Sequence, residues 1–300
     1  HLEIKKTFQT GYLSEGKISK KFQNKIINFI KNKNVTLVNS CTSALTMAYK
    51  IVNVKDAEVI TTPLTCVAAN VPLLHQGAKI IWSDIDLETG MITAETIEKC
   101  ITEKTKAISV LHKDGQPADM GPILKIAKKY NLKIIEDAAQ AIGSKYKGIH
   151  AGNFGDFGCF SAHPLKNLNA IGDSGYLTTK SNKISSYIRD LRNHGMTNRN
   201  KVKNFGYVSR MDNIQAAILN FRLDGLNTLI KKRRNNFKIY ENYLNRKYIY
   251  FPMETEHEFN TYHTFVIQVN YRNKLRSFLK NKGIETAIHY PIPIHLQPAA

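Results

Sequence analysis

The sequence predicts an α/β fold, with helices on both faces of a mostly parallel sheet and a smaller αβ unit toward the C-terminal end. Between residues 35 and 161, short runs rich in Val and Ile alternate with longer helical patterns. From residue 181 the pattern is mainly helical, and near residue 248 a second, smaller strand-and-helix pattern begins. These three observations predict a large domain over residues 1–225 and a small domain over residues 226–300.

The predicted strands are runs of four or five residues, as expected of strands that are buried on both faces of a parallel sheet. They cover residues 35–38, 58–61, 79–82, 107–111, 133–136 and 157–161. The predicted helices between them cover residues 44–52, 68–76, 94–101 and 122–130. Ligands of such sheets bind beyond the carboxyl ends of the strands, so the residues that follow each strand are the first candidates for a functional site.

The second half of the chain begins with two long helical patterns. Residues 181–193 and 213–244 are predicted to be largely helical, the latter with apolar side chains near helical spacing. An apolar stretch at 264–269 precedes a predicted helix over 274–282. Gly283 then ends that helix, because glycine readily adopts the left-handed conformation of a helix C-terminus.

The chain is strongly basic, with a net charge of +19 over 300 residues. Lysine runs together with asparagine and isoleucine throughout, and no nucleic-acid-binding motif accompanies the charge, so we expect no nucleic-acid partner. No run approaches the roughly 20 apolar residues of a membrane span. The first residues contain no signal-peptide core, so we expect a cytoplasmic protein without membrane association.

The cysteines do not form a recognisable metal or disulfide pattern. None of the four belongs to a CxxC pair, and they are widely separated along the chain. This spacing predicts reduced thiols and no metal site. The four residues are Cys41, Cys66, Cys100 and Cys159.

Asp137 ends a predicted strand, in the segment IIEDAAQA at residues 134–141. A carboxylate at the ligand-binding edge of the sheet can pair with a protonated heterocycle such as the pyridinium ring of pyridoxal phosphate (PLP). It can equally cap the turn that follows the strand. The motif alone leaves these two interpretations open.

Lys166 follows the predicted strand at 157–161 and precedes the Gly-rich turn IGDSG at 171–175. A lysine that forms a Schiff base must reach a pocket and lose its proton, and a position near a cationic cofactor helps it to do so. In a chain this basic, a solvated surface lysine is the simpler interpretation.

The segment NSCTSAL at residues 39–45 joins a predicted strand to a predicted helix. Small hydroxyl side chains at a helix N-terminus act as caps, and the free amides of the same turn bind phosphate. Both interpretations remain open for this segment by itself.

Together, these segments resemble the DegT/DnrJ/EryC1/StrS sugar aminotransferases, which are PLP-dependent enzymes of the aspartate-aminotransferase fold (fold type I). The resemblance covers nearly the whole chain. It rests on further motifs as well: GYLSEG at 11–16, TPLTCVAAN at 62–70, GQPADM at 115–120, RNHG at 192–195, SRMDNIQAA at 209–217 and HYP at 289–291. Since the family continues past residues 295–298, the resemblance also implies that the small domain is incomplete.

The resemblance implies a role for each candidate residue. Lys166 would carry the cofactor through an imine and move protons at the substrate carbon, and Asp137 would pair with the pyridinium nitrogen. Gln140 would lie near the ring hydroxyl, while Ser161 and the amides around Cys41 and Thr42 would bind the cofactor phosphate.

The family's reaction would take an amino group from an amino acid, usually glutamate, and give it to a keto group of a nucleotide-linked deoxysugar, as in polysaccharide biosynthesis. The implied state is a homodimer, with residues of one subunit completing the site of the other.

Three positions depart from the family pattern. Cys41 replaces a Gly or another small residue of the phosphate loop, and Cys66 stands where an aromatic ring commonly stacks on the cofactor. Val208 replaces an Asn that reaches the neighbouring subunit's phosphate. Each change weakens one expected cofactor contact. His163, next to the lysine motif, is interpreted as a packing or orienting residue.

Two other functions share parts of this pattern. A PLP-dependent sugar dehydratase shares the fold but has histidine in place of the Schiff-base lysine, and Lys166 argues against it. A non-catalytic regulatory or binding member of the fold would explain the three departures, but it does not explain why Lys166, Asp137 and Gln140 occur together.

Overall fold

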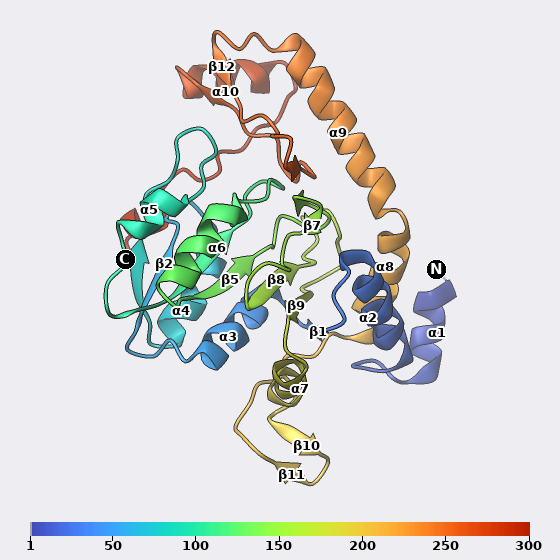
Figure 1. Ribbon diagram of the computed structural model, residues 1–300. Helices are drawn as coiled ribbons and strands as arrows, with labels where there is room; N and C mark the ends of the chain where they lie inside the picture. Colours follow the sequence, from blue (N-terminus) through green and yellow to red (C-terminus); the bar gives the residue numbers. More distant parts are fainter. Residues whose placement is uncertain (1) are drawn as a thin grey trace.

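A seven-stranded sheet forms the centre of the computed structural model, which describes residues 2–300 (Figure 1). In spatial order its strands are β1 (Val35–Val38), β9 (Gly175–Thr179), β8 (Phe157–Ser161), β5 (Lys133–Asp137), β4 (Thr105–Leu111), β2 (Glu58–Thr61) and β3 (Lys79–Trp82). All neighbours pair in parallel except at β9, which is antiparallel to both β1 and β8. The predicted mostly parallel α/β sheet is therefore confirmed.

Helices cover both faces of this sheet because successive residues of each strand point to opposite sides. Val59, Ile135 and Cys159 pack on one face with α3 (Cys41–Val52), α4 (Val71–His75) and α7 (Asn182–Leu191). Their chain neighbours Ile60, Ile134 and Phe160 pack on the other face. That second face is covered by α2 (Lys17–Ile30), α5 (Ala94–Glu98), α6 (Met120–Lys129) and α8 (Asn213–Asp224).

Strand β9 was not predicted from the sequence. It is buried along its whole length, so its side chains show no alternation between polar and apolar residues. Gly175, its first residue, also reads as part of the preceding turn. An antiparallel partner needs only a short connection, and here the loop 162–174 joins β8 to β9 and carries Lys166.

Two predicted helices are interrupted in the structure. The pattern at 68–76 becomes a 3-10 turn, η1 (Val67–Ala69), followed by α4, in which Pro72 occupies the first turn. The long pattern at 213–244 divides at Gly225 into α8 and α9 (Leu226–Tyr243). A further helix, α1 (Leu2–Thr10), precedes the GYLSEG motif.

The C-terminal part builds a second, smaller core. Phe237 of α9 stacks on Tyr262, and both pack with Phe251 and Phe265. Of the predicted apolar stretch at 264–269, only β14 (Gln268–Val269) is a strand, paired with β12 (Ile249–Tyr250), and α10 (Arg272–Asn281) follows. The predicted domain boundary after residue 225 stays a prediction.

Three short pairings lie outside the central sheet. β6 (Lys145–Tyr146) pairs with β7 (Ile149–His150) and with β13 (Glu258–Phe259), which joins the large part to the small one. The hairpin of β10 (Met196–Asn198) and β11 (Lys201–Val202) projects away from the sheet below α7 (Figure 1). The chain ends beside α5 after η2 (Ile294–Leu296), where the Ile294 amide donates to the Pro63 carbonyl at 3.0 Å.

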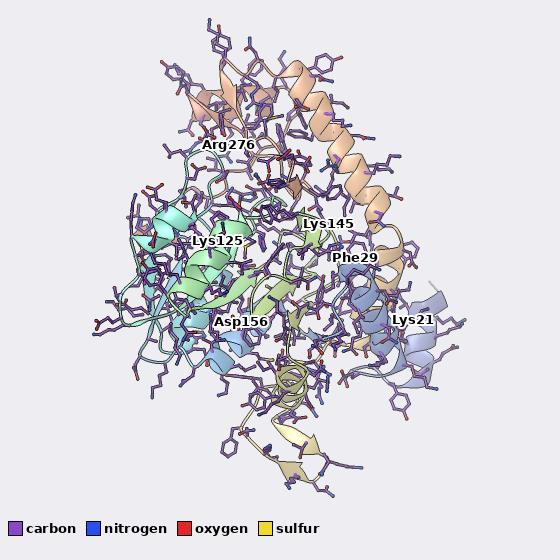
Figure 2. All side chains as sticks on the ribbon, in the orientation of Figure 1. Lys21, Phe29, Lys125, Lys145, Asp156 and Arg276 are labelled. Atoms are coloured by element: carbon purple, nitrogen blue, oxygen red, sulfur yellow. The ribbon has the colours of Figure 1, made fainter. Side chains whose placement is uncertain are left out.

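The positive charge is spread over the molecule. Figure 2 shows the labelled side chains Lys21, Lys125, Lys145 and Arg276 on separate parts of the chain, namely α2, α6, β6 and α10. Among the described residues, no helix combines the length and the apolar character needed to cross a membrane.

Candidate active site

The predicted site residues converge on the carboxyl edge of the sheet. They follow β1, β2, β5 and β8, four strands that run in the same direction, so their carboxyl ends share one edge. By the alternation along each strand, Asp137 and Ser161 point to the face of Ile135 and Cys159, which is the face covered by α3.

Asp137 is the buried carboxylate of this edge, with 5% of its surface exposed. Its Oδ1 accepts a hydrogen bond from the Ala139 amide at 3.0 Å. Burial raises the pKa of the Asp137 carboxyl, while the Ala139 amide and the positive charge of Lys166 oppose that rise. The side chain is thus placed where a cationic partner would stabilise its ionised form.

Lys166 lies in the loop between β8 and β9, in a tight turn closed by its own amide and the His163 carbonyl at 2.9 Å. Its side chain is partly buried, and it acts on the pKa values of Asp137, Cys41 and His263. Within residues 2–300, no hydrogen bond or ion pair engages its ammonium group. The amine therefore remains available to a ligand.

The N-terminus of α3 lies beside these two residues. Ser40 caps the helix by accepting from the Ser43 amide at 3.1 Å, which confirms the capping interpretation. A Cβ at Gly175 would lie 2.7 Å from the Cys41 nitrogen, so this glycine lets β9 approach the helix end closely. Cys41 is buried, and burial, followed by the charge of Asp137, raises the pKa of its thiol well above the usual value.

The remaining predicted residues surround this centre. Thr42 follows Cys41 in the first turn of α3, and Ser161 ends β8, where its hydroxyl accepts from the His163 amide at 3.2 Å. Gln140 donates from its Nε2 to the Tyr290 hydroxyl at 3.4 Å. Cys66 is exposed at the start of η1, on the loop after β2.

Among the departures, Val208 is 61% exposed and pairs with Asn193 in an isolated bridge. His163 accepts from the Leu165 amide through Nδ1 at 3.2 Å, and its packing or orienting role stays a prediction.

Two further residues of the site receive no role from the sequence, although the HYP motif at 289–291 contains one of them. His263 comes from the small part of the chain, with its Nδ1 3.5 Å from the Asn167 Oδ1. Burial, and then the positive charge of Lys166, lowers the pKa of His263 to about 4. The second is Tyr290, whose phenol pKa is raised to about 12 by burial and then by Cys66. Both lie more than ninety residues from Lys166 in the sequence, where spacing carries no signal.

A second buried carboxylate, Glu136, lies directly before Asp137 and points to the opposite face of the sheet. Its two oxygens accept from His112 Nε2 at 2.8 Å and from three backbone amides at 2.7 Å. Those amides belong to Gly152, Phe154 and Gly155. Every strong acceptor direction of Glu136 is therefore used within the protein.

The sequence predicts no metal site. In the part of the chain that the structure describes, no cluster of three or more His, Cys, Asp or Glu side chains has the arrangement to hold a metal ion.

The whole chain, residues 1–300, matches the family model described as the DegT/DnrJ/EryC1/StrS aminotransferase family. The chain belongs to this family. The resemblance inferred from the motifs is thereby confirmed, and the protein is an aminotransferase of the PLP-dependent fold.

Individual relatives of the DegT/DnrJ/EryC1/StrS family agree over most of their length. A dTDP-3-amino-3,6-dideoxy-alpha-D-galactopyranose transaminase of Aneurinibacillus thermoaerophilus is 35% identical over 99% of this chain and 82% of its own. A UDP-N-acetyl-3-dehydro-alpha-D-glucosamine 3-aminotransferase of Acidithiobacillus ferrooxidans is 38% identical over 86% of this chain and 70% of its own. The crystal structure of DesV from S. venezuelae, solved with a ketimine intermediate, superposes with a TM-score of 0.95 at 30% identity, over 99% of this chain and 81% of DesV.

Proposed function

We propose that this protein is a PLP-dependent aminotransferase that moves an amino group from an amino acid, glutamate, to the keto group of a nucleotide-linked deoxysugar. The names of the relatives, which are transaminases of dTDP- and UDP-linked sugars, support the substrate class. The observation that carries the proposal is the pairing of a free lysine amine with a buried, under-bonded carboxylate: Lys166 acts electrostatically on Asp137 at the edge where ligands bind.

The residues present fit the cofactor. The pKa of Asp137 is raised by burial, so a protonated ring nitrogen would supply the missing counter-charge. The amides of Cys41 and Thr42 at the start of α3, with the Ser161 hydroxyl, would hold the phosphate. Gln140 would lie at the ring hydroxyl, beside Tyr290. When bound, PLP acts as an electron sink, and it carries the amino group from the donor to the acceptor.

The protein's own part in the reaction is positioning and proton transfer. The amine of Lys166 would hold the cofactor at rest and move a proton at the substrate carbon. Asp137 would keep the ring nitrogen protonated throughout. With its pKa near 4, His263 is neutral at physiological pH, so it adds no positive charge beside the lysine.

The proposal includes a homodimer, as the family resemblance implies.

Cys66, which stands where an aromatic ring is common, would leave one face of the cofactor without a stacking partner.

The test uses purified protein with PLP, glutamate and a panel of keto nucleotide sugars. We expect 2-oxoglutarate and an amino sugar in equal amounts, and a visible absorbance band from the lysine-bound cofactor. Lys166→Ala should remove the band and lower turnover by about 10³-fold or more. The matched control is Lys125→Ala, since Lys125 is an exposed lysine of α6 (Figure 2), on the sheet face opposite α3, and it should change neither.

The other functions give different results. A deoxygenated keto sugar without 2-oxoglutarate would indicate a dehydratase. A wild-type protein that binds PLP but turns over no member of the panel with glutamate would contradict the proposed reaction.

A further inference from the structure

A two-residue turn at Asp114–Gly115, just beyond β4, joins the large and small parts of the protein. The Thr261 amide donates to the Gly115 carbonyl at 3.1 Å, and the Thr264 amide donates to the Asp114 carbonyl at 3.3 Å. Both turn residues have positive φ, 58° and 95°. At Gly115 a Cβ would lie 2.6 Å from the His263 nitrogen, so only glycine lets the two segments come this close.

The Asp114 side chain adds to the contact between this turn and the segment 261–264. One carboxylate oxygen accepts a hydrogen bond from the Thr264 hydroxyl, and the other forms an ion pair with Lys113. The Lys113 side chain is only 6% exposed and that of Asp114 only 18%, so water screens the pair weakly. Removing the carboxylate would leave both the Thr264 hydroxyl and the Lys113 charge without this partner.

The same turn also orients Gln140. The Asp114 amide donates to Gln140 Oε1 at 2.6 Å. Because the amide oxygen is engaged on that side, the Nε2 group is turned toward the Tyr290 hydroxyl, 3.4 Å away. The orientation of Gln140, and with it the group offered to a ligand, therefore depends on the conformation of Asp114.

On the small-domain side, the segment 261–264 carries His263. The Asn167 side chain, next to Lys166, donates to the Thr261 carbonyl at 3.4 Å and lies 3.5 Å from His263 Nδ1. Arg233 of α9 donates to the carbonyls of Tyr262 and His263 at 3.1 and 2.9 Å. The segment is thus held between α9 on one side and the turn at Asp114–Gly115 on the other.

We propose that Asp114 is a positioning residue. It docks the segment 261–264, which carries His263, on the turn that also holds the Gln140 amide, and it thereby places Gln140 and His263 relative to each other. The inference rests on the proposed function only in its second measurement, since the docking itself is a property of the chain. Asp114 acts through Gln140 and through the segment 261–264.

The first measurement is hydrogen exchange on the full chain without cofactor. In Asp114→Ala, the amides of 261–264 should exchange about tenfold faster or more, because two of them donate to this turn. The amide of Phe259, in the separate pairing of β13 with β6, should keep its wild-type rate. Asp56→Ala is the matched control, since Asp56 is also an aspartate at φ 58° but lies in the turn between α3 and β2.

A conservative variant separates hydrogen bonding from charge. Asp114→Asn combined with Lys113→Met removes both charges but keeps an oxygen that accepts from Thr264, and asparagine tolerates the left-handed conformation. This double variant should return the exchange rates of 261–264 to near wild type. If Asp114→Ala does not fold, Thr264→Val removes the same hydrogen bond from the other side and should also speed exchange.

The second measurement is made with PLP bound. The pH midpoint of the visible cofactor band in Asp114→Ala should shift in the same direction as in Gln140→Leu, and the double variant should restore it. Unchanged exchange at 261–264 in both Asp114→Ala and Thr264→Val would overturn the docking. Faster exchange with an unshifted midpoint would overturn the link to Gln140. A wild type that shows no cofactor band contradicts the proposed function instead, and the exchange result stands apart from it.

Discussion

Two adjacent carboxylates, Glu136 and Asp137, point to opposite faces of the same strand and differ in the number of hydrogen bonds that they accept. Glu136 is fully buried and accepts four hydrogen bonds, three of them from backbone amides. Asp137 is nearly as buried but accepts one hydrogen bond, from the Ala139 amide, and burial raises its pKa. One carboxylate is stabilised by the fold, while the other is left for a ligand to stabilise.

This difference gives a physical way to distinguish a structural buried charge from a functional one. A buried acid with all its acceptors used contributes to stability, because losing its partners would leave polar groups unsatisfied. A buried acid with spare acceptors and a raised pKa costs stability in the unliganded protein, and such acids are common at functional sites. Sequence position does not separate the two, since they are neighbours.

The strongest test of this comparison exchanges each acid for its amide. Glu136→Gln keeps the size of the side chain but replaces one acceptor with a donor that faces the Gly152 amide and His112, so the unfolding free energy should fall by about 2–3 kcal/mol. Asp137→Asn should leave the stability of the cofactor-free protein unchanged or raise it, while turnover falls on the order of 10²–10³-fold. Urea unfolding and steady-state rates on both variants measure the two effects.

The comparison fails if the two variants behave alike. A destabilised Asp137→Asn would mean that this acid, too, is held by the fold. A Glu136→Gln protein as stable as wild type would mean that its four hydrogen bonds contribute nothing net.

Acid should lower the free energy of unfolding through protonation of His263. Its pKa in the folded protein is about 4, below the ordinary value of 6.5, so the unfolded chain binds more protons between these pH values. Stability is therefore lost as the pH falls from 6.5 toward 4, and fully retained above 6.5. Wild type should lose on the order of 2 kcal/mol more than His263→Gln over this window.

Urea unfolding at several pH values between 4 and 7 measures this difference. His75→Gln is a suitable control, because His75 is an exposed residue at the end of α4, and it should follow the wild-type profile. His150, whose pKa is also lowered to about 4 by burial, contributes in the same direction in all of these proteins. Parallel curves for wild type and His263→Gln would show that the site does not respond to acid through His263.

The smallest expected effect concerns Cys66, the exposed residue proposed to leave the cofactor without a stacking ring. Cys66→Tyr should raise PLP affinity about 2- to 10-fold, since an aromatic pair contributes about 0.5–1.5 kcal/mol. Cys66→Leu adds bulk without an aromatic face and serves as the control. Equal affinities in the two variants, measured by titration of the absorbance band, would attribute any gain to burial alone.

Much of the fold follows from local sequence patterns. The strands at 35–38, 58–61, 79–82 and 157–161 have the predicted bounds, because each is a short β-branched or aromatic run between clear turn residues. Strand β9 escaped prediction because it is buried on both sides and begins in a glycine turn. The break at Gly225 between α8 and α9 was hidden by continuous apolar spacing on either side.

The candidate site divides in the same way. Asp137 and Lys166 stand out as candidates because they lie at or after the carboxyl ends of strands that meet at one edge, and the family resemblance then assigns their roles and that of Ser161. His263 and Tyr290 reach the same place from the small part and the C-terminal segment, through contacts that tertiary folding alone creates. The roles assigned to all these residues remain proposals.

Helix α9 has a mechanical consequence. Its first turns, at Leu226 and Ile230, are anchored in the large core, and Phe237 further along belongs to the small core. An unbroken helix of 18 residues is about 27 Å long, so a tilt of one degree at its base moves its far end by about 0.5 Å. Because Arg233 of α9 binds the segment 261–264, which also docks on the turn at Asp114–Gly115, such a tilt would strain the hydrogen bonds on both sides of that segment.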